Sequence, residues 1–154
     1  MITKELKDAV ILFAGDSGDG MQLTGNQFTQ TAAIFGNDIN TLPDFPAEIR
    51  APSGTVAGVS GYQVHFGSSE INSPGDYCDV LVAMNAAALK KNIDKVKKSG
   101  IIIANISGFD NKNLRLANYE ESPIDGLKNI FTIYEIDITK QTLEVLKETT
   151  LSQK

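Results

Sequence analysis

The sequence predicts an α/β domain in three layers, a mainly parallel sheet with helices on both faces and an antiparallel addition. The first observation is that short apolar runs alternate along the 154 residues with segments of helical periodicity. The second is a glycine-rich turn at 15–20, which joins the first apolar run to the first helix. The third is a β-prone segment at 55–66, whose mixed polarity fits an antiparallel strand.

Strands are expected wherever an apolar or β-prone run ends at a turn signal. Continuous apolar runs fit parallel strands that are covered on both faces. The segment 55–66 fits an edge or antiparallel strand better, because it mixes polar and apolar residues. Gly58 and Gly61 lack side chains on one face, where another backbone could approach closely. In chain order, the expected strands are 9–14, 38–42, 55–66, 79–84, 101–105 and 130–138.

Helices are expected over 21–35, 86–98 and 139–149. Gly36 ends the first helix. The second ends in a lysine-rich turn, which suits the negative end of the helix dipole, and Gly100 caps it. Asp137 or Thr139 is expected to cap the start of the third. The polar, irregular segment 108–129 should cover one end of the sheet.

Composition restricts the partners and cofactors of this chain. A net charge of -5 argues against a nucleic-acid backbone or an anionic membrane surface as the main partner. No apolar run is long enough to span a bilayer, and no secretory signal opens the chain. The single cysteine, Cys78, suits a reducing compartment, so a cytoplasmic location is expected. With one Cys and one His, this chain is expected to hold no metal site or iron–sulfur cluster of its own.

The glycine-rich turn is the first candidate site. A strand, a glycine turn and a helix start present free backbone N–H groups to an anion. The glycine spacing matches neither the dinucleotide fingerprint nor a Walker A loop, and Asp16 and Asp19 would repel a phosphate. A phosphate cradle and a tight structural turn therefore both remain open. The candidate binding residues are Gly15, Ser17, Gly18, Asp19 and Gly20.

The proline-rich segment 43–54 is the second candidate site. A connection of this length without regular structure is often functional. The candidate binding residues here are Glu48, Arg50 and Ser53. Arg50 could hold a phosphate or carboxylate by bidentate donation, and Ser53 could add a hydroxyl and a backbone N–H. The alternative is an ion pair of Arg50 with Glu48 or Asp44 inside the segment. No catalytic residue is predicted in either candidate site.

Three segments together resemble the gamma component of 2-oxoacid:ferredoxin oxidoreductases. The segment 11–20 is similar to the opening of that component, although Ser17 departs from the usual Gly-x-Gly-Gly-x-Gly. This departure fits the branch in which the domain is fused ahead of the alpha component. The most specific match is Phe-Pro-Ala-Glu-Ile-Arg-Ala-Pro at 45–52, and the segment 71–83 also matches. The likeness runs from about residue 8 to residue 138.

The resemblance implies a function that the residues alone do not. The family oxidatively decarboxylates 2-oxoacids with coenzyme A to acyl-CoA and passes the electrons to ferredoxin. The fused branch is most often associated with 2-oxoglutarate. Thiamine diphosphate lies between the alpha and beta components, and iron–sulfur clusters lie on other parts of the complex. The gamma domain holds none of these alone, packs against the alpha and beta components, and is associated with the coenzyme A side of the active site. By this resemblance, the isolated domain is expected to be inactive.

The resemblance also implies a division of the chain. Residues 1–138 would form the gamma-type domain, and 139–154 would begin a linker helix toward a following domain. Two other functions remain open. A free-standing dinucleotide-binding oxidoreductase would need Asp44 to hold a ribose. A non-catalytic packing module would use Glu48 and Arg50 only to pair with each other. An isolated domain of this kind should expose an apolar patch that its partners cover in the complex.

Overall fold

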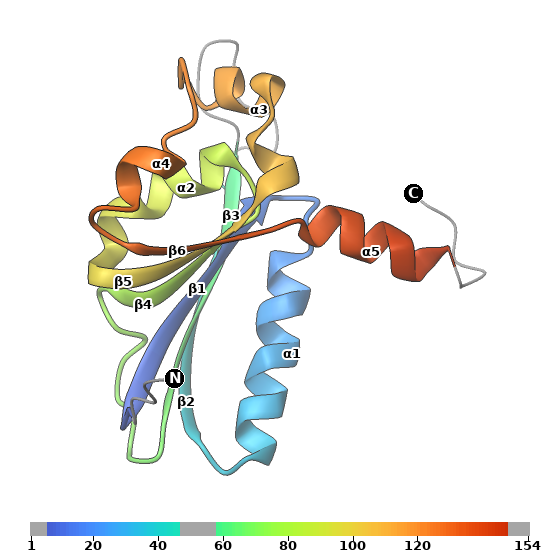
Figure 1. The fold of residues 1–154 in the computed structure, drawn as a ribbon. Helices are drawn as coiled ribbons and strands as arrows, with labels where there is room; N and C mark the ends of the chain where they lie inside the picture. The colour runs from blue at the N-terminus through green and yellow to red at the C-terminus, as the bar shows by residue number, and fades with distance from the viewer. Residues whose placement is uncertain (1–5, 47–57, 148–154) are drawn as a thin grey trace.

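The computed structural model describes residues 6–46 and 58–147, which form one mixed sheet with helices on both sides (Figure 1). The strands are β1 Asp8–Asp16, β2 Asp38–Asp44, β3 Val59–Gly67, β4 Cys78–Ala83, β5 Val96–Asn105 and β6 Thr132–Ile136. They lie in the order β2-β3-β1-β4-β5-β6. β3 runs antiparallel to both of its neighbours, whereas β1, β4, β5 and β6 are parallel to one another. The expected fold class is confirmed.

Helices cover the two faces of the sheet unequally. They are α1 Met21–Ile34, α2 Ala86–Asn92, α3 Asn111–Leu116, α4 Ile124–Leu127 and α5 Ile138–Leu146, with 3-10 turns η1 Ile93–Lys95 and η2 Ile106–Phe109. α1 packs on one face, against β1, β2 and β3. α2 packs on the opposite face, and α3 packs against α2 (Figure 1).

The face beneath α2 holds the larger core. Leu12, Leu81 and Ile102 come from adjacent strands, and each is 3% exposed or less. Leu89 and a run of alanines from α2 close over them, which allows helix and sheet to approach closely. The main source of stability therefore lies between α2 and the centre of the sheet.

On the other face, α1 sits close to the sheet because one of its residues lacks a side chain. A Cβ added at Gly25 would lie 2.2 Å from the ring of Tyr62. Phe28 packs its ring between Phe13 and Phe66, at centroid distances of 5.7 and 5.2 Å. This contact covers only the β2-β3-β1 half of the face.

The helix expected over 86–98 is too long, and this prediction is wrong at its C-terminal end. α2 ends at Asn92, and after η1 the chain enters β5 at Val96. Lys97 lies in that strand, and its Nζ lies 2.8 Å from Asp79 Oδ1 across the β4–β5 pair. Gly100 is also in the strand, so it caps no helix. Of the lysines that suited a helix end, Lys97 and Lys98 lie in β5, and Lys97 is held by this ion pair.

Two further expectations need correction and two are confirmed. The antiparallel direction of β3 is confirmed, but β3 lies inside the sheet and β2 takes the edge. Pro43 in β2 is consistent with an edge position, because proline lacks the N–H that a central strand needs. The segment 108–129 contains α3 and α4, so it is less irregular than expected. Asp137 caps the start of α5, because its side chain accepts a hydrogen bond from the backbone N–H of Lys140. This confirms one of the two expected cap residues.

Candidate functional site

The glycine-rich turn follows β1 at the carboxyl edge of the parallel strands. The side chain of Asp19 closes the turn, because its Oδ2 accepts a hydrogen bond from the backbone N–H of Asp16 at 2.8 Å. The backbone N–H of Asp19 donates in return to the carbonyl of Asp16 at 3.0 Å. Gly15 makes room for this carboxylate, because a Cβ there would lie 2.6 Å from Asp19 Oδ2. Gly20 has a φ of 73°, a left-handed conformation that favours glycine.

This arrangement places negative charge where a phosphate would need donors. Burial raises the pKa of Asp19, and the Asp16 carboxylate adds to the rise against the opposing hydrogen bond from the Asp16 N–H. A phosphate inside the turn would meet both carboxylates. The geometry therefore favours a structural corner over a phosphate cradle, although the turn brings all five of its candidate residues together.

Asn85 connects this corner to the next strand and helix. Its Oδ1 accepts from the backbone N–H of Ala88 at 2.8 Å and so caps the start of α2. Its Nδ2 donates to Asp16 Oδ1 at 2.9 Å. The sequence analysis missed Asn85, although an asparagine between an apolar strand and an alanine run is a typical helix cap.

A second asparagine joins the carboxyl ends of β4, β5 and β6. Asn105 Nδ2 donates to the carbonyl of Met84 at 3.2 Å and to Thr139 Oγ1 at 3.0 Å. Nearby, Ser107 Oγ donates to Asp137 Oδ1 at 2.7 Å. Hydrogen bonds from Ser107 and from the Lys140 N–H lower the pKa of Asp137. The carboxyl edge is thus one connected polar layer.

The two ends of the proline-rich connection are fixed at the same edge. Gln22 Nε2 on α1 donates to the carbonyl of Gly61 at 2.8 Å and to Ser60 Oγ at 3.2 Å. Lys91 Nζ on α2 lies 3.1 Å from Asp44 Oδ2 and 3.2 Å from the carbonyl of Val59. Lys91 therefore ties the end of β2 to the start of β3.

The remaining candidates, Glu48, Arg50 and Ser53, lie outside the described residues. Asp44, one of the two partners considered for Arg50, forms an ion pair with Lys91.

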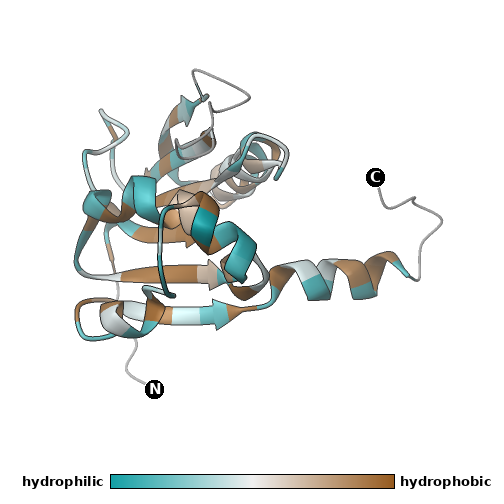
Figure 2. Cartoon of the chain, turned by 90° about the horizontal axis from the view of Figure 1, so that it is seen from above, coloured by the Kyte–Doolittle hydropathy of each residue, from teal (hydrophilic) through white to brown (hydrophobic). Residues whose placement is uncertain are grey.

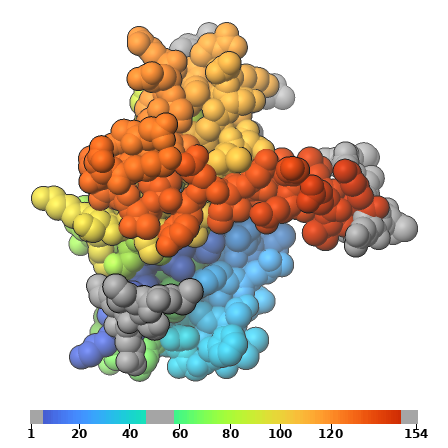
Figure 3. Space-filling view, in the orientation of Figure 1, coloured from blue at the N-terminus to red at the C-terminus, as the bar shows by residue number. Residues whose placement is uncertain are grey.

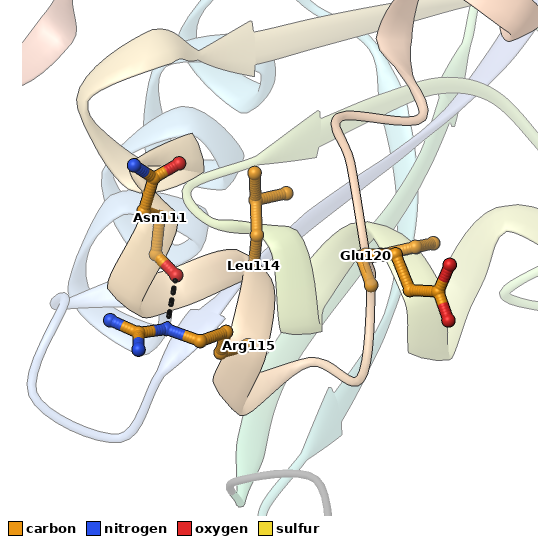
Figure 4. Close-up of a pocket in the computed structure, with 5 residues that line it drawn as sticks. Asn111, Leu114, Arg115 and Glu120 are labelled. Carbon is orange, nitrogen blue, oxygen red and sulfur yellow. Dashed lines mark hydrogen bonds between the residues drawn. The ribbon is translucent and has the colours of Figure 1, made fainter.

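A hollow of about 310 Å³ lies beside α3 (Figure 4). It is lined by Asn111, Leu114, Arg115, Tyr119 and Glu120. Arg115 Nε donates to the carbonyl of Asn111 at 3.0 Å, and the Glu120 carboxylate points away from the guanidinium. Lys90 Nζ lies 4.7 Å from the ring centroid of Tyr119. The five lining residues include no nucleophile beside a base.

The other chemically versatile side chains lie away from the carboxyl edge. Cys78 begins β4 at the opposite end and is fully buried, which raises the pKa of its thiol to about 11. His65 contacts the carbonyl of Ser73 through Nδ1 at 2.7 Å and Asp8 Oδ1 through Nε2 at 3.2 Å. Both side chains therefore have structural surroundings.

The strand order disfavours a dinucleotide site. In a dinucleotide-binding fold the second strand lies directly beside the first and ends in the ribose-binding carboxylate. Here the antiparallel β3 separates β2 from β1, and Asp44 at the end of β2 is paired with Lys91. A ribose held at Asp44 would lie one strand farther from the glycine-rich turn.

Comparison with known proteins decides the family. Residues 10–152 match the family described as pyruvate ferredoxin/flavodoxin oxidoreductase. The chain belongs to this family. It is 45% identical over 152 residues to the 2-oxoglutarate oxidoreductase subunit KorA of Mycobacterium tuberculosis. That match covers 98% of this chain but 23% of the relative, so the chain spans about a quarter of the relative's length.

Solved structures of family members share the fold. The structure of 2-oxoglutarate:ferredoxin oxidoreductase from Magnetococcus marinus, with 2-oxoglutarate, coenzyme A and succinyl-CoA bound, matches 93% of this chain and 22% of that chain. Its TM-score is 0.71 at 29% identity. Pyruvate oxidoreductase subunit PORC from Thermotoga maritima matches 92% of this chain and 68% of its own, with a TM-score of 0.59 at 17% identity, which shows the fold alone.

Two properties of the described residues bear on membranes and metals. No helix in residues 6–46 and 58–147 has the length and apolar character needed to cross a bilayer. Within the same ranges, no three His, Cys, Asp or Glu side chains gather as metal ligands.

Proposed function

We propose that this chain is the gamma-type domain of a 2-oxoglutarate:ferredoxin oxidoreductase. The observation that carries the proposal is the 45% identity to the KorA subunit over 98% of this chain. Residues 1–138 would be the gamma-type domain, and 139–154 would begin the link to a following domain. The partners would be the alpha and beta components of the enzyme, with ferredoxin reached through the complex. The lone Cys78 supports a cytoplasmic location.

The proposed reaction forms succinyl-CoA from 2-oxoglutarate. The C1–C2 bond breaks and releases carbon dioxide, and C2 forms a thioester bond with the sulfur of coenzyme A. The thiol proton is released, and two electrons pass to two oxidised ferredoxins. Thiamine diphosphate and iron–sulfur clusters on the other components would supply carbanion stabilisation and electron transfer. In this division of labour, the present domain performs no covalent step.

The contribution of this domain would be to position coenzyme A. Gln22 and Lys91 fix both ends of the connection that carries Arg50 at the carboxyl edge, where open α/β sheets bind ligands. An arginine there could donate to a phosphate group of coenzyme A, with Ser53 as a further donor and Glu48 orienting the guanidinium. The glycine-rich turn would support this segment sterically, since Asp16 and Asp19 make it a poor phosphate site.

The test is coenzyme A-dependent reduction of ferredoxin by the assembled enzyme. Arg50→Ala should raise the KM for coenzyme A about 10- to 100-fold, because one charge-assisted contact is worth about 1.5–3 kcal/mol. Arg115→Ala, which removes the other arginine of this chain, is the matched control and should change the KM less than about twofold.

Three results would change the proposal. An enzyme that reduces no ferredoxin with 2-oxoglutarate and coenzyme A would overturn the function. An unchanged KM in Arg50→Ala would remove Arg50 from the coenzyme A site. If that variant also assembled poorly with its partners, the result would support a packing role for the segment instead.

A further inference from the structure

Half of one sheet face is left without a covering helix. Strand register brings six side chains to the same face, on the side where α1 covers only the other half. Four are half-buried, Thr132 is exposed, and Tyr134 is 53% exposed. We name this surface the open face; it consists of Val80, Val82, Ile101, Ile103, Thr132 and Tyr134.

The amino acids of the open face are those of a buried surface. None of the six is charged, and four are aliphatic. A strand with one face in water normally alternates apolar and polar residues. β4 and β5 instead carry continuous apolar runs, Val80–Ala83 and Ile101–Ala104, which are typical of strands covered on both faces. Apolar surface of this kind on a folded domain marks a protein interface.

The helix that follows the open face is held to the described part of the domain mainly through its first turn, which lies against η2 and Asn105. α5 begins two residues after β6, the strand that borders the open face, and it projects away from the body of the molecule (Figures 2 and 3). None of its residues is buried, and Leu143 and Val145 are 39% and 66% exposed. An amphipathic helix that leaves its apolar side exposed needs a further surface to pack on.

The length of the relative indicates what covers this region. The KorA subunit continues for about three quarters of its length outside the part that this chain matches. We infer that the open face and the apolar side of α5 dock the alpha component of the same enzyme through an aliphatic, uncharged surface on that component. This inference rests on the proposed function. A second copy of this chain is the competing occupant.

Cysteine labelling in the assembled enzyme tests the inference. Tyr134→Cys places a thiol on the open face, and Leu116→Cys places one at a position of α3 with similar exposure, 51% against 53%. Labelling is measured by mass spectrometry on the peptide that carries each position, so cysteines of the partners do not interfere. Native Cys78 adds little background, since it is buried and its thiol pKa is about 11.

The expected result is a difference between the two positions. Tyr134→Cys should react at least about tenfold more slowly than Leu116→Cys, because access limits thiol reactivity. Thr132→Cys, a second exposed position on the open face, should be protected in the same way.

Two results would overturn the inference. Equal labelling rates at positions 134 and 116 would show that the open face is not selectively covered. A cross-link between two copies of this chain through Tyr134→Cys would show that a second copy is the occupant. Both are read in enzyme that turns over 2-oxoglutarate, so inactive enzyme counts against the proposed function and not against the docking surface.

Discussion

Ile102 and Ile103 are neighbours in β5, yet they face two different environments. Ile102 is 1% exposed between β4 and the helices on the α2 side, whereas Ile103 is half-buried on the open face. The strand is equally apolar on both sides. The comparison teaches that the composition of a strand reflects every surface it covers in the complete assembly, whereas exposure in one domain reflects only the helices that this domain supplies.

The largest expected effect is a difference in stability loss when each of these two isoleucines is replaced by alanine. Ile102→Ala should lower the free energy of unfolding by about 3–4 kcal/mol, because the buried site cannot collapse around the cavity. Ile103→Ala should cost about 1 kcal/mol in the free domain, since water already reaches that side chain. Urea unfolding of the two variants measures both values. Equal losses would mean that the two faces are equally packed and would remove the distinction.

A smaller effect tests how tightly α1 covers its half of the second face. Gly25→Ala should destabilise the domain by about 1–2 kcal/mol, because its Cβ would overlap the ring of Tyr62. Gly126→Ala in α4 is the matched control, since a Cβ there meets no atom within 4 Å. It should be neutral or stabilise by up to about 1 kcal/mol through helix propensity. A neutral Gly25→Ala would show that α1 can shift on the sheet.

The smallest expected effects concern the pH dependence of stability. They should have opposite signs at Asp137, at the start of α5, and Asp19, just before α1. The folded pKa of Asp137, at the start of α5, lies below the ordinary 3.8. Its stabilisation is therefore present above pH 3.8 and lost as the pH falls through the folded pKa. Asp137→Asn should lower the urea midpoint of unfolding at neutral pH. The difference in midpoint between the variant and the unmutated domain should disappear at acidic pH.

Asp19, beside α1, should behave in the opposite way. Its folded pKa is raised above 3.8, so its ionisation costs stability as the pH rises from 3.8 through the folded value. Asp19→Asn should remove that fall while keeping an oxygen to accept from the Asp16 N–H. Urea midpoints measured across this pH range check both variants. The same sign in both would contradict the assigned environments.

Much of the architecture could be predicted from local patterns. Runs such as 79–84 and 101–105 identified strands, because burial on both faces requires unbroken apolar sequence. The end of α2 could not be predicted, because Lys97 is placed by Asp79 on the adjacent strand, a partner 18 residues away. Lys91 and the bond from Asn85 to Asp16 were missed for a similar reason. Their roles depend on Asp16 and Asp44, which only the folded chain brings near.

The sequence by itself determined the fold class, the glycine-rich turn after the first strand and the resemblance to the oxidoreductase family, because each rests on residues close together in the chain. Only the tertiary structure decided that β3 separates Asp44 from this turn, and that Lys91 pairs with Asp44. The open face also follows only from the tertiary structure, because it depends on which half of the sheet α1 covers. Periodicity tells which side chains need burial, and the packing of distant elements decides which of them this domain buries itself.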